Sequence, residues 1–264
     1  MNGGLLIVLQ QIINQATASS EINYVLADYL LRNSDDDSLS ISRVADETHI
    51  SKASVSRFAQ SLGYDGFSEL KRDLELVKFE RDELILDFKA TKNLNKSNQQ
   101  TKELQTEFDI VTDDLKNYSQ QINYDEIQKL CELIYNSKDI YIISTLIPNN
   151  LSNILQTTLL NAGKVTYSFP SIKQQLNIIN QISKDDLALF ISLEGSHISQ
   201  REMTLSITNS GATTVLITQN PEMKLSSLFD YIFSLGEHDI ERTGKYKLLM
   251  FIEYFSHFYL NQFY

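Results

Sequence analysis

Small hydroxyl side chains and two cations alternate with apolar residues in the stretch SKASVSRFAQSLG, residues 51–63. Val55, Phe58 and Leu62 recur at helical spacing, so they predict the buried face of a short helix. The opposite face would present the side chains able to bond with base edges and phosphates, namely Ser51, Lys52, Ser54, Ser56, Arg57 and Gln60. A recognition helix needs this shape, because small residues let it enter the major groove while hydroxyls and cations bond there. The pattern predicts a DNA-reading helix, but it fits equally well a helical bundle whose polar face touches nothing or binds protein.

Two serines can start the helices that position this face. Ser40 and Ser51 each precede an apolar periodic segment, and a serine oxygen at that place can accept a hydrogen bond from a free amide of the first turn. A tight turn at residues 48–50 would join the two helices, and Gly63 would end the second. We therefore expect two short helices in immediate succession.

The charge of the chain has to be reconciled with DNA binding. The formal net charge is −11, and acidic side chains outnumber basic ones by eleven to seven through residue 79, which argues against a general polyanion binder. Screening removes the effect of charges beyond roughly 8–10 Å at physiological salt, so Arg43, Lys52 and Arg57 can cluster at the groove while the acidic loop SDDDS, residues 34–38, lies elsewhere. So few cations predict weak binding by one copy, and hence two copies on a two-fold related site in double-stranded DNA.

The rest of the chain changes its hydrophobic period. Residues 1–79 are expected to be all-helical and residues 80–122 to form a helical and polar linker, whereas residues 123–264 alternate apolar runs with amphipathic helices. The runs rich in β-branched and aromatic residues are 139–144, 164–169, 186–192, 213–218 and 230–235. Near-continuous apolar strands that alternate with helices indicate a parallel sheet covered on both faces. The fold expected is a helical domain followed by a three-layer α/β/α domain with a five-stranded parallel sheet.

The residues ADYLL, followed by SISRVADETHISKASVSRFAQSLGYDGFSELKRDL, closely resemble the amino-terminal domain of the RpiR family of bacterial transcriptional regulators. The family has a Ser-x-Ala-Thr-Val-x-Arg-Phe recognition helix and then Leu-Gly-Phe-x-Gly-Phe-x-Glu-Leu-Lys, which residues 51–58 and 62–71 match. The resemblance implies a helix-turn-helix domain that binds DNA, and a final helix that starts near residues 66–68.

The layout from residue 123 onward resembles a sugar isomerase (SIS) domain, the usual sensor of RpiR-family regulators, which typically binds phosphorylated sugars and pairs with itself. The resemblance implies an effector site formed by Ser144, Thr145, Ser192, Glu194, Ser196 and His197. Two motifs depart from the family. A Gly-x-Gly-x-Ser-like turn is replaced by STLIP at residues 144–148, and Ser-x-Ser-Gly-x-Thr is replaced by SLEGSH at residues 192–197.

These departures disfavour a sugar phosphate in the usual pose. A lost hydroxyl contact costs about 1–3 kcal/mol, and a carboxylate about 4 Å from a phosphate charge repels it by roughly 4 kcal/mol at an effective dielectric near 20. Three alternatives remain open. The domain is retained for dimerisation with an empty pocket, it binds a neutral or cationic ligand through Glu194, or it binds a phosphosugar in a shifted pose helped by Lys173, Lys245 or His197.

Other features narrow the class of protein. The four histidines show no metal-ligand spacing, one cysteine excludes an internal disulfide framework, and no apolar run is long enough to cross a bilayer. Aromatic residues on more than one face of the last helix favour a homo-oligomer, dimer or tetramer. We expect a cytoplasmic regulator of sugar metabolism genes with a small sugar-related effector, without cofactor, metal or membrane contact.

One alternative comes from another class of protein. An SIS-type isomerase or sugar-phosphate-binding protein would use an acid or base such as Glu194, His197, Glu237 or His238. We expect no enzyme, because the phosphate anchor that would hold such a substrate is missing.

Overall fold

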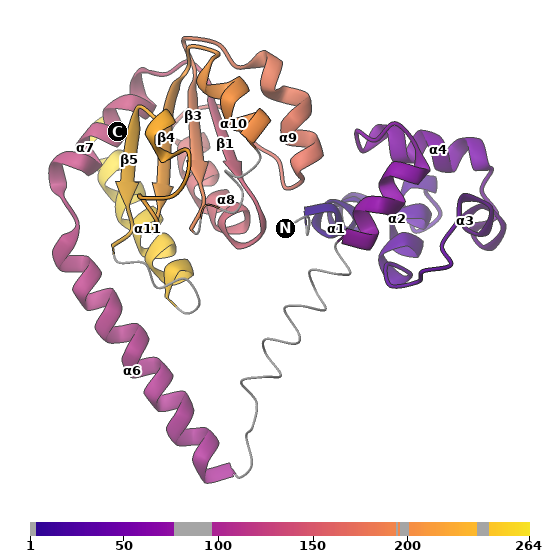
Figure 1. Ribbon diagram of the computed structural model, residues 1–264, viewed down its shortest axis with the longest axis horizontal. Helices are drawn as coiled ribbons and strands as arrows, with labels where there is room; N and C mark the ends of the chain where they lie inside the picture. Colours follow the sequence, from indigo (N-terminus) through magenta and orange to yellow (C-terminus); the bar gives the residue numbers. More distant parts are fainter. Residues whose placement is uncertain (1–3, 77–96, 194, 196–200, 237–242) are drawn as a thin grey trace. The chain divides into compact units, whose positions relative to one another are not determined.

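The computed structural model describes residues 4–76, 97–193, 195, 201–236 and 243–264, which form a helical unit at the amino-terminal end and an α/β unit that carries the sheet (Figure 1). The domain boundaries predicted at residues 79 and 122 remain predictions. Helix α6, Ser97–Gln121, lies within the predicted linker and begins in its polar part. None of the helices described has both the length and the apolar character needed to cross a membrane.

The helical unit consists of short amphipathic helices around one core. Its elements are α1 (Gly4–Gln15), α2 (Ile22–Arg32), α3 (Ile41–Thr48), α4 (Lys52–Ser61) and a further helix over residues 67–76. Each contributes fully buried apolar side chains, among them Leu9, Leu26, Leu30, Val44, Val55 and Leu70. Burial of these side chains supplies most of the stability of helices that would be marginal in isolation.

The α/β unit contains one five-stranded sheet in the order β2-β1-β3-β4-β5, and every neighbouring pair is parallel. The strands are β1 (Ile140–Ser144), β2 (Thr166–Ser168), β3 (Leu187–Ile191), β4 (Thr213–Thr218) and β5 (Tyr231–Ser234). The helices that accompany the sheet are α7 (Tyr124–Asn136), α8 (Leu146–Asn161), α10 (Arg201–Thr208) and α11 (Gly244–Phe263), with short 3-10 turns at Ile179–Gln181 and Ser226–Leu228. Helix α9 (Ile172–Ile178) lies almost wholly in residues 170–177, which group with the helical unit. The predicted fold class and parallel sheet are confirmed.

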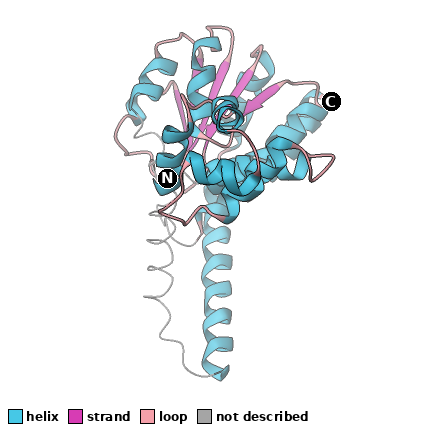
Figure 2. Ribbon diagram, turned by 90° about the vertical axis from the view of Figure 1, so that its right-hand side faces the viewer, coloured by secondary structure: helices cyan, strands magenta, loops and turns pink. Residues whose placement is uncertain are grey.

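Two separate cores show that the sheet is the middle of three layers (Figure 2). Ile140 and Ile142 of β1 belong to the core under α7, α8 and α11, whereas Tyr141 and Ile143 belong to the core that includes residues of α10. Burial on both faces explains why these strands read as continuous apolar runs and not as alternating ones.

The strand order creates a switch point between β1 and β3. The chain passes from β1 to β2 on one side and from β3 to β4 on the other, so the two connections leave neighbouring strands in opposite directions. In open α/β sheets, ligands bind in the crevice outside the carboxyl ends of strands at such a point. Ser144 pairs in register with Ile191, which places Ser144 and Ser192 together at this edge.

Candidate DNA interface and effector crevice

Both predicted helix caps are present. The Oγ of Ser40 accepts a hydrogen bond from the Arg43 amide at 3.3 Å, and the Oγ of Ser51 accepts one from the Ser54 amide at 3.2 Å. Between the two helices, His49 adopts a left-handed conformation with φ 56°, which reverses the chain at the end of α3. The turn predicted at residues 48–50 is therefore confirmed, and it sets α4 directly after α3.

The two faces of α4 are as different as the sequence predicts. Val55, Phe58, Ala59 and Leu62 are buried in the core of the helical unit. The outward side chains of Lys52, Ala53, Arg57 and Gln60 are exposed, and those of Ser54 and Ser56 are half-buried. The face predicted to read DNA is thus open on the surface of its own unit.

A short chain of hydrogen bonds organises the amino-terminal half of this face. Arg57 donates from Nη2 to the Oγ of Ser54 at 2.9 Å, and that oxygen lies 3.0 Å from the Oγ of Ser51. Across the part of the chain that the structure describes, neither Lys52 nor Arg57 forms an ion pair with a carboxylate. Both positive charges therefore remain uncompensated at the place where a phosphate or a base edge would be met.

Arg43 has different surroundings. Its Nε donates to Oε1 of Glu47 at 2.7 Å, and its Nη1 donates to Oδ2 of Asp36 at 2.6 Å. The Glu47 hydrogen bond, followed by the charges of Asp36 and Glu47, raises the pKa of the Arg43 guanidinium. The expectation that the acidic loop at residues 34–38 lies elsewhere is wrong, because this loop precedes α3 closely enough for Asp36 to reach the first turn. A phosphate that approaches Arg43 must therefore compete with two carboxylates for this guanidinium.

At the carboxyl edge of the sheet, the structure brings together part of the predicted effector site. Ser144 is fully buried at the end of β1, and Ser192 follows β3 with 4% of its surface exposed. Thr145 is the half-buried residue that precedes α8, and its side chain makes no capping hydrogen bond. Glu194, Ser196 and His197 lie outside the described residues.

The turn after β3 is internally bonded. The Oγ of Ser192 accepts a hydrogen bond from the Gly195 amide at 3.1 Å. Gly195 has φ 86°, and a Cβ on it would lie 2.3 Å from the Sδ of Met223, so this position accommodates only glycine. The amide of Gly195 is therefore already used within the protein.

Asn149 is a site residue that sequence reasoning missed. It lies in the first turn of α8, is 3% exposed, and its Nδ2 donates to Oγ of Ser144 at 3.3 Å, Oγ of Ser168 at 3.1 Å and the carbonyl of Phe169 at 3.4 Å. No signal in the sequence singled out Asn149, because α8 carries several other polar residues, among them Asn150, Ser152 and Asn153. Because Pro148, in the same turn, has no amide hydrogen, the start of α8 offers fewer donors to an anion than a helix usually does.

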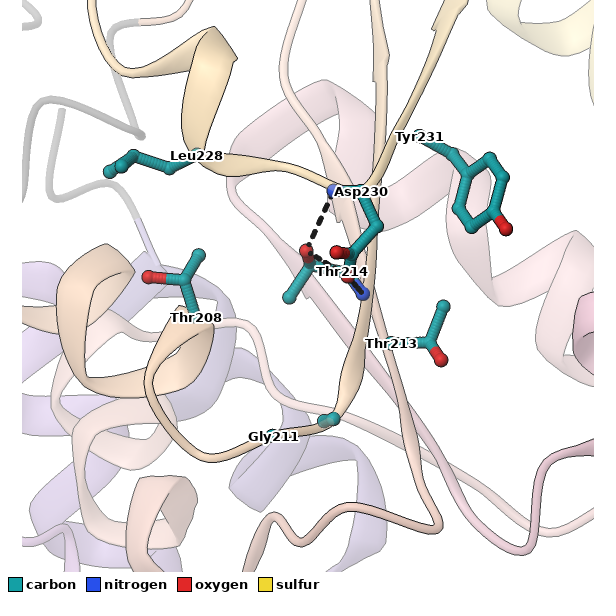
Figure 3. Close-up of a pocket in the computed structure, with 8 residues that line it drawn as sticks. Thr208, Gly211, Thr213, Thr214, Leu228, Asp230 and Tyr231 are labelled. Atoms are coloured by element: carbon teal, nitrogen blue, oxygen red, sulfur yellow. Dashed lines mark hydrogen bonds between the residues drawn. The ribbon is translucent and has the colours of Figure 1, made fainter.

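Two open hollows lie at the opposite edge of the sheet, at the amino ends of strands. One, of about 360 Å³, is bordered by the starts of β4 and β5, and the other, of about 600 Å³, includes Lys129, Lys138 and Lys184. In the first, Oδ2 of Asp230 accepts from the amide and the Oγ1 of Thr214 at 2.8 and 2.9 Å, and Thr214 Oγ1 accepts from the Asp230 amide at 3.1 Å (Figure 3). These groups bond to each other, so they join two strands and do not reach toward a ligand.

Comparison with protein families identifies the amino-terminal region. Residues 6–77 match the model described as the helix-turn-helix domain, rpiR family, as the sequence resemblance predicted. An uncharacterized HTH-type transcriptional regulator of Clostridium perfringens is 22% identical over 228 residues, which cover 85% of this chain and 80% of that protein.

Solved structures with a similar fold include the NanR protein of Vibrio vulnificus complexed with ManNAc-6P, which has a TM-score of 0.54 and 18% identity over 98% of this chain and 92% of that one. The sugar isomerase domain of an RpiR transcription factor from Sphaerobacter thermophilus has a TM-score of 0.53 and 11% identity, over 60% of this chain and 89% of that one. A ligand complex of an Escherichia coli CFT073 protein has a TM-score of 0.51 and 14% identity, over 64% of this chain and 95% of that one. These likenesses establish that the α/β unit has the fold of a sugar isomerase domain.

Proposed function

We propose that this chain, whose amino-terminal unit is a helix-turn-helix domain of the RpiR family, is a DNA-binding transcriptional regulator and not an enzyme. The observation that carries the proposal is the outer face of α4, where Lys52 and Arg57 have no carboxylate partner among the described residues. The buried face of the same helix is held in the core by Val55, Phe58 and Leu62. Helix α4 would enter the major groove, with α3 crossing the backbone beside it.

The side chains of this face would make different kinds of contact with DNA. Arg57, held toward the amino end of α4 by Ser54, is placed to bond to a base edge or a phosphate. Lys52 and Ser51 begin the helix and would meet the phosphate backbone, with Ser56 and Gln60 further along the groove. Arg43 would contribute after it releases Asp36 and Glu47.

Two uncompensated cations per copy imply weak binding by a single domain, because phosphate neutralisation supplies most of the affinity for DNA. We therefore infer that a homo-oligomer binds a two-fold related operator in the cytoplasm, with the α/β units holding the copies together. Exposed aromatic side chains on the last helix, with Tyr246 41% and Tyr254 44% accessible, support self-association of that unit.

The α/β unit would serve first for dimerisation and second as a sensor for a small sugar-related molecule, and the regulated genes would belong to sugar metabolism. ManNAc-6P accompanies the similar NanR structure, and the same crevice here would be formed by Ser144, Thr145 and Ser192 together with Glu194, Ser196 and His197. An effector changes DNA binding only if it binds unequally to two arrangements of the dimer.

The function can be tested before the operator sequence has been found. Full-length protein would be used to enrich fragments from a random-sequence DNA pool, and the enriched fragments would be sequenced. We expect a motif with two inverted half-sites. Enrichment of no motif above that obtained with the Arg57→Ala variant would refute sequence-specific binding through α4.

A further inference from the structure

Helix α6 carries an apolar stripe with a seven-residue repeat. Leu104, Phe108, Val111, Leu115 and Tyr118 follow one another at intervals of four, three, four and three residues. An average spacing of 3.5 residues is characteristic of a helix that packs lengthwise against another helix, as in a coiled coil. The stripe therefore indicates a helical partner along the whole series.

The carboxyl-terminal end of the stripe has its partner within the same unit. Tyr118 is 3% exposed and belongs to the core that α11 completes. Beside it, Oδ2 of Asp114 lies 2.7 Å from Nζ of Lys247 on α11, and Lys247 is 1% exposed. The last turns of α6 are thus fixed to the α/β unit by an apolar contact and a buried ion pair.

The same stripe continues toward the amino end of α6, in the part of the helix that extends beyond α11 (Figure 1). There Phe108 has 72% of its surface exposed, and Val111 is half-buried. Val111 repeats the heptad position of the buried Tyr118, seven residues later, and Phe108 precedes it on the same stripe. A large apolar side chain such as Phe108, with nothing in the described residues covering it, indicates an interaction surface.

We propose that Phe108 and Val111 pack against the same residues of α6 in a second copy of this chain, with the two helices parallel and in register. The residues that flank the stripe favour this occupant. In a parallel pair, heptad position 100 is opposite position 105 and position 107 is opposite position 112. The sequence has glutamine with glutamine at the first pair and glutamate with threonine at the second, so no like charges are paired across the interface. In an antiparallel pair the acidic positions Glu107 and Asp114 would approach each other, which like-charge repulsion disfavours.

Two further acidic residues fit the same register. Asp109 and Asp113 fall on the side of the helix away from the stripe, where they stay in solvent. Parallel pairing places both Ser97 ends together, so the two chains lead toward their DNA-binding units from the same end. A paired segment of about one heptad is too short to be stable alone, so it would strengthen an association that the α/β units also make. The proposal stands whether or not the protein binds DNA.

Cysteine cross-linking tests the pairing and its register. The native Cys131 is buried, and burial raises the pKa of its thiol to about 12, which suppresses its reactivity. Full-length Phe108→Cys should form a covalent dimer under mild oxidation, because equivalent stripe positions lie close together in a parallel pair. Ile110→Cys is the matched control, since Ile110 is also exposed, at 40%, but lies off the stripe. The proposal would be overturned if Phe108→Cys formed no covalent dimer, or if Ile110→Cys formed a covalent dimer equally fast.

A second measurement does not depend on oxidation. Phe108→Glu should raise the dimer dissociation constant in sedimentation equilibrium by about tenfold or more, whereas Ile110→Glu should change it by less than about twofold. Equal effects of the two substitutions would contradict a specific role of the stripe. Because neither experiment contains DNA, their outcome is separate from that of the operator search.

Discussion

Arg57 Nη2 lies 2.9 Å from the Oγ of Ser54, one turn earlier on the exposed face of α4. The guanidinium is therefore held toward the amino end of the helix before DNA is present. Holding a long side chain in its working orientation reduces the conformational entropy lost on binding. The bond thus connects the sequence pattern Ser-x-x-Arg with the ability of this face to read DNA.

Substitution of Ser54 tests this positioning role. Ser54→Ala removes the acceptor without removing charge, so operator affinity should fall by about 3–10-fold, the equivalent of one hydrogen bond. Ser119→Ala, on an exposed serine of α6 that bonds to the carbonyl of Lys116, is the control and should leave affinity unchanged. Fluorescence anisotropy on an enriched operator measures both. Equal affinities of Ser54→Ala and wild-type protein would remove Ser54 from the interface.

The pairing of Arg43 with Asp36 should restrain DNA binding. Asp36→Asn weakens the ion pair that holds the Arg43 guanidinium against the loop, so the affinity for DNA should rise. Because Arg43 would then contact one more phosphate, the slope of log affinity against log salt concentration should become more negative by about one unit. Asp37→Asn makes the same change of charge at the adjacent residue and serves as the control. A salt series of anisotropy titrations compares them. If both substitutions strengthen binding to the same extent, net charge and not Arg43 is responsible.

The predicted repulsion in the effector crevice can be measured by calorimetry. Glu194→Ser restores the serine that the family motif has, so the variant should bind sugar phosphates at least about tenfold more tightly than wild-type protein. Tight binding of a sugar phosphate by the wild-type protein would show that the repulsion argument is wrong.

The reciprocal bonds between Thr214 and Asp230 predict a stability effect at the end of the sheet opposite to the effector crevice. Thr214 is 1% exposed, so Thr214→Val keeps its shape while leaving the Asp230 carboxylate without a hydroxyl donor. The free energy of unfolding should fall by about 1–3 kcal/mol. Thr213→Val, on the half-buried neighbour, should cost less, and DNA affinity should be unchanged in both. Denaturant titration with two optical probes would show whether the two threonines differ as expected.

Much of the fold could be predicted because its determinants are local. The strands that lie inside the sheet read as continuous apolar runs, and the caps at Ser40 and Ser51 depend on residues three positions away. The contacts that were missed join segments distant in sequence or depend on loop geometry. Asn149 could be recognised only once the ends of β1 and β2 are known to lie beside it, and Arg43 only once the preceding loop is seen to fold back.

In the linker, the composition of the sequence predicted the secondary structure less well than its hydrophobic periodicity. The polar run at residues 92–103 is typical of a flexible connection, yet α6 begins at Ser97 within it. The apolar stripe of the following turns, anchored on α11 by Tyr118, explains why the helix forms there. Of the predicted effector residues, Ser144, Thr145 and Ser192 share one edge of the sheet, and the other three fall outside the described part.

The most direct test of the account is the operator affinity of Arg57→Ala, measured beside Arg32→Ala. Both substitutions remove one exposed arginine from the helical unit, but Arg32 is paired with Asp28 on α2 and lies off the proposed face. We predict that Arg57→Ala weakens binding by about 10–100-fold and Arg32→Ala by less than about threefold. Unchanged affinity of Arg57→Ala, or equal losses for both variants, would contradict DNA recognition by the outer face of α4.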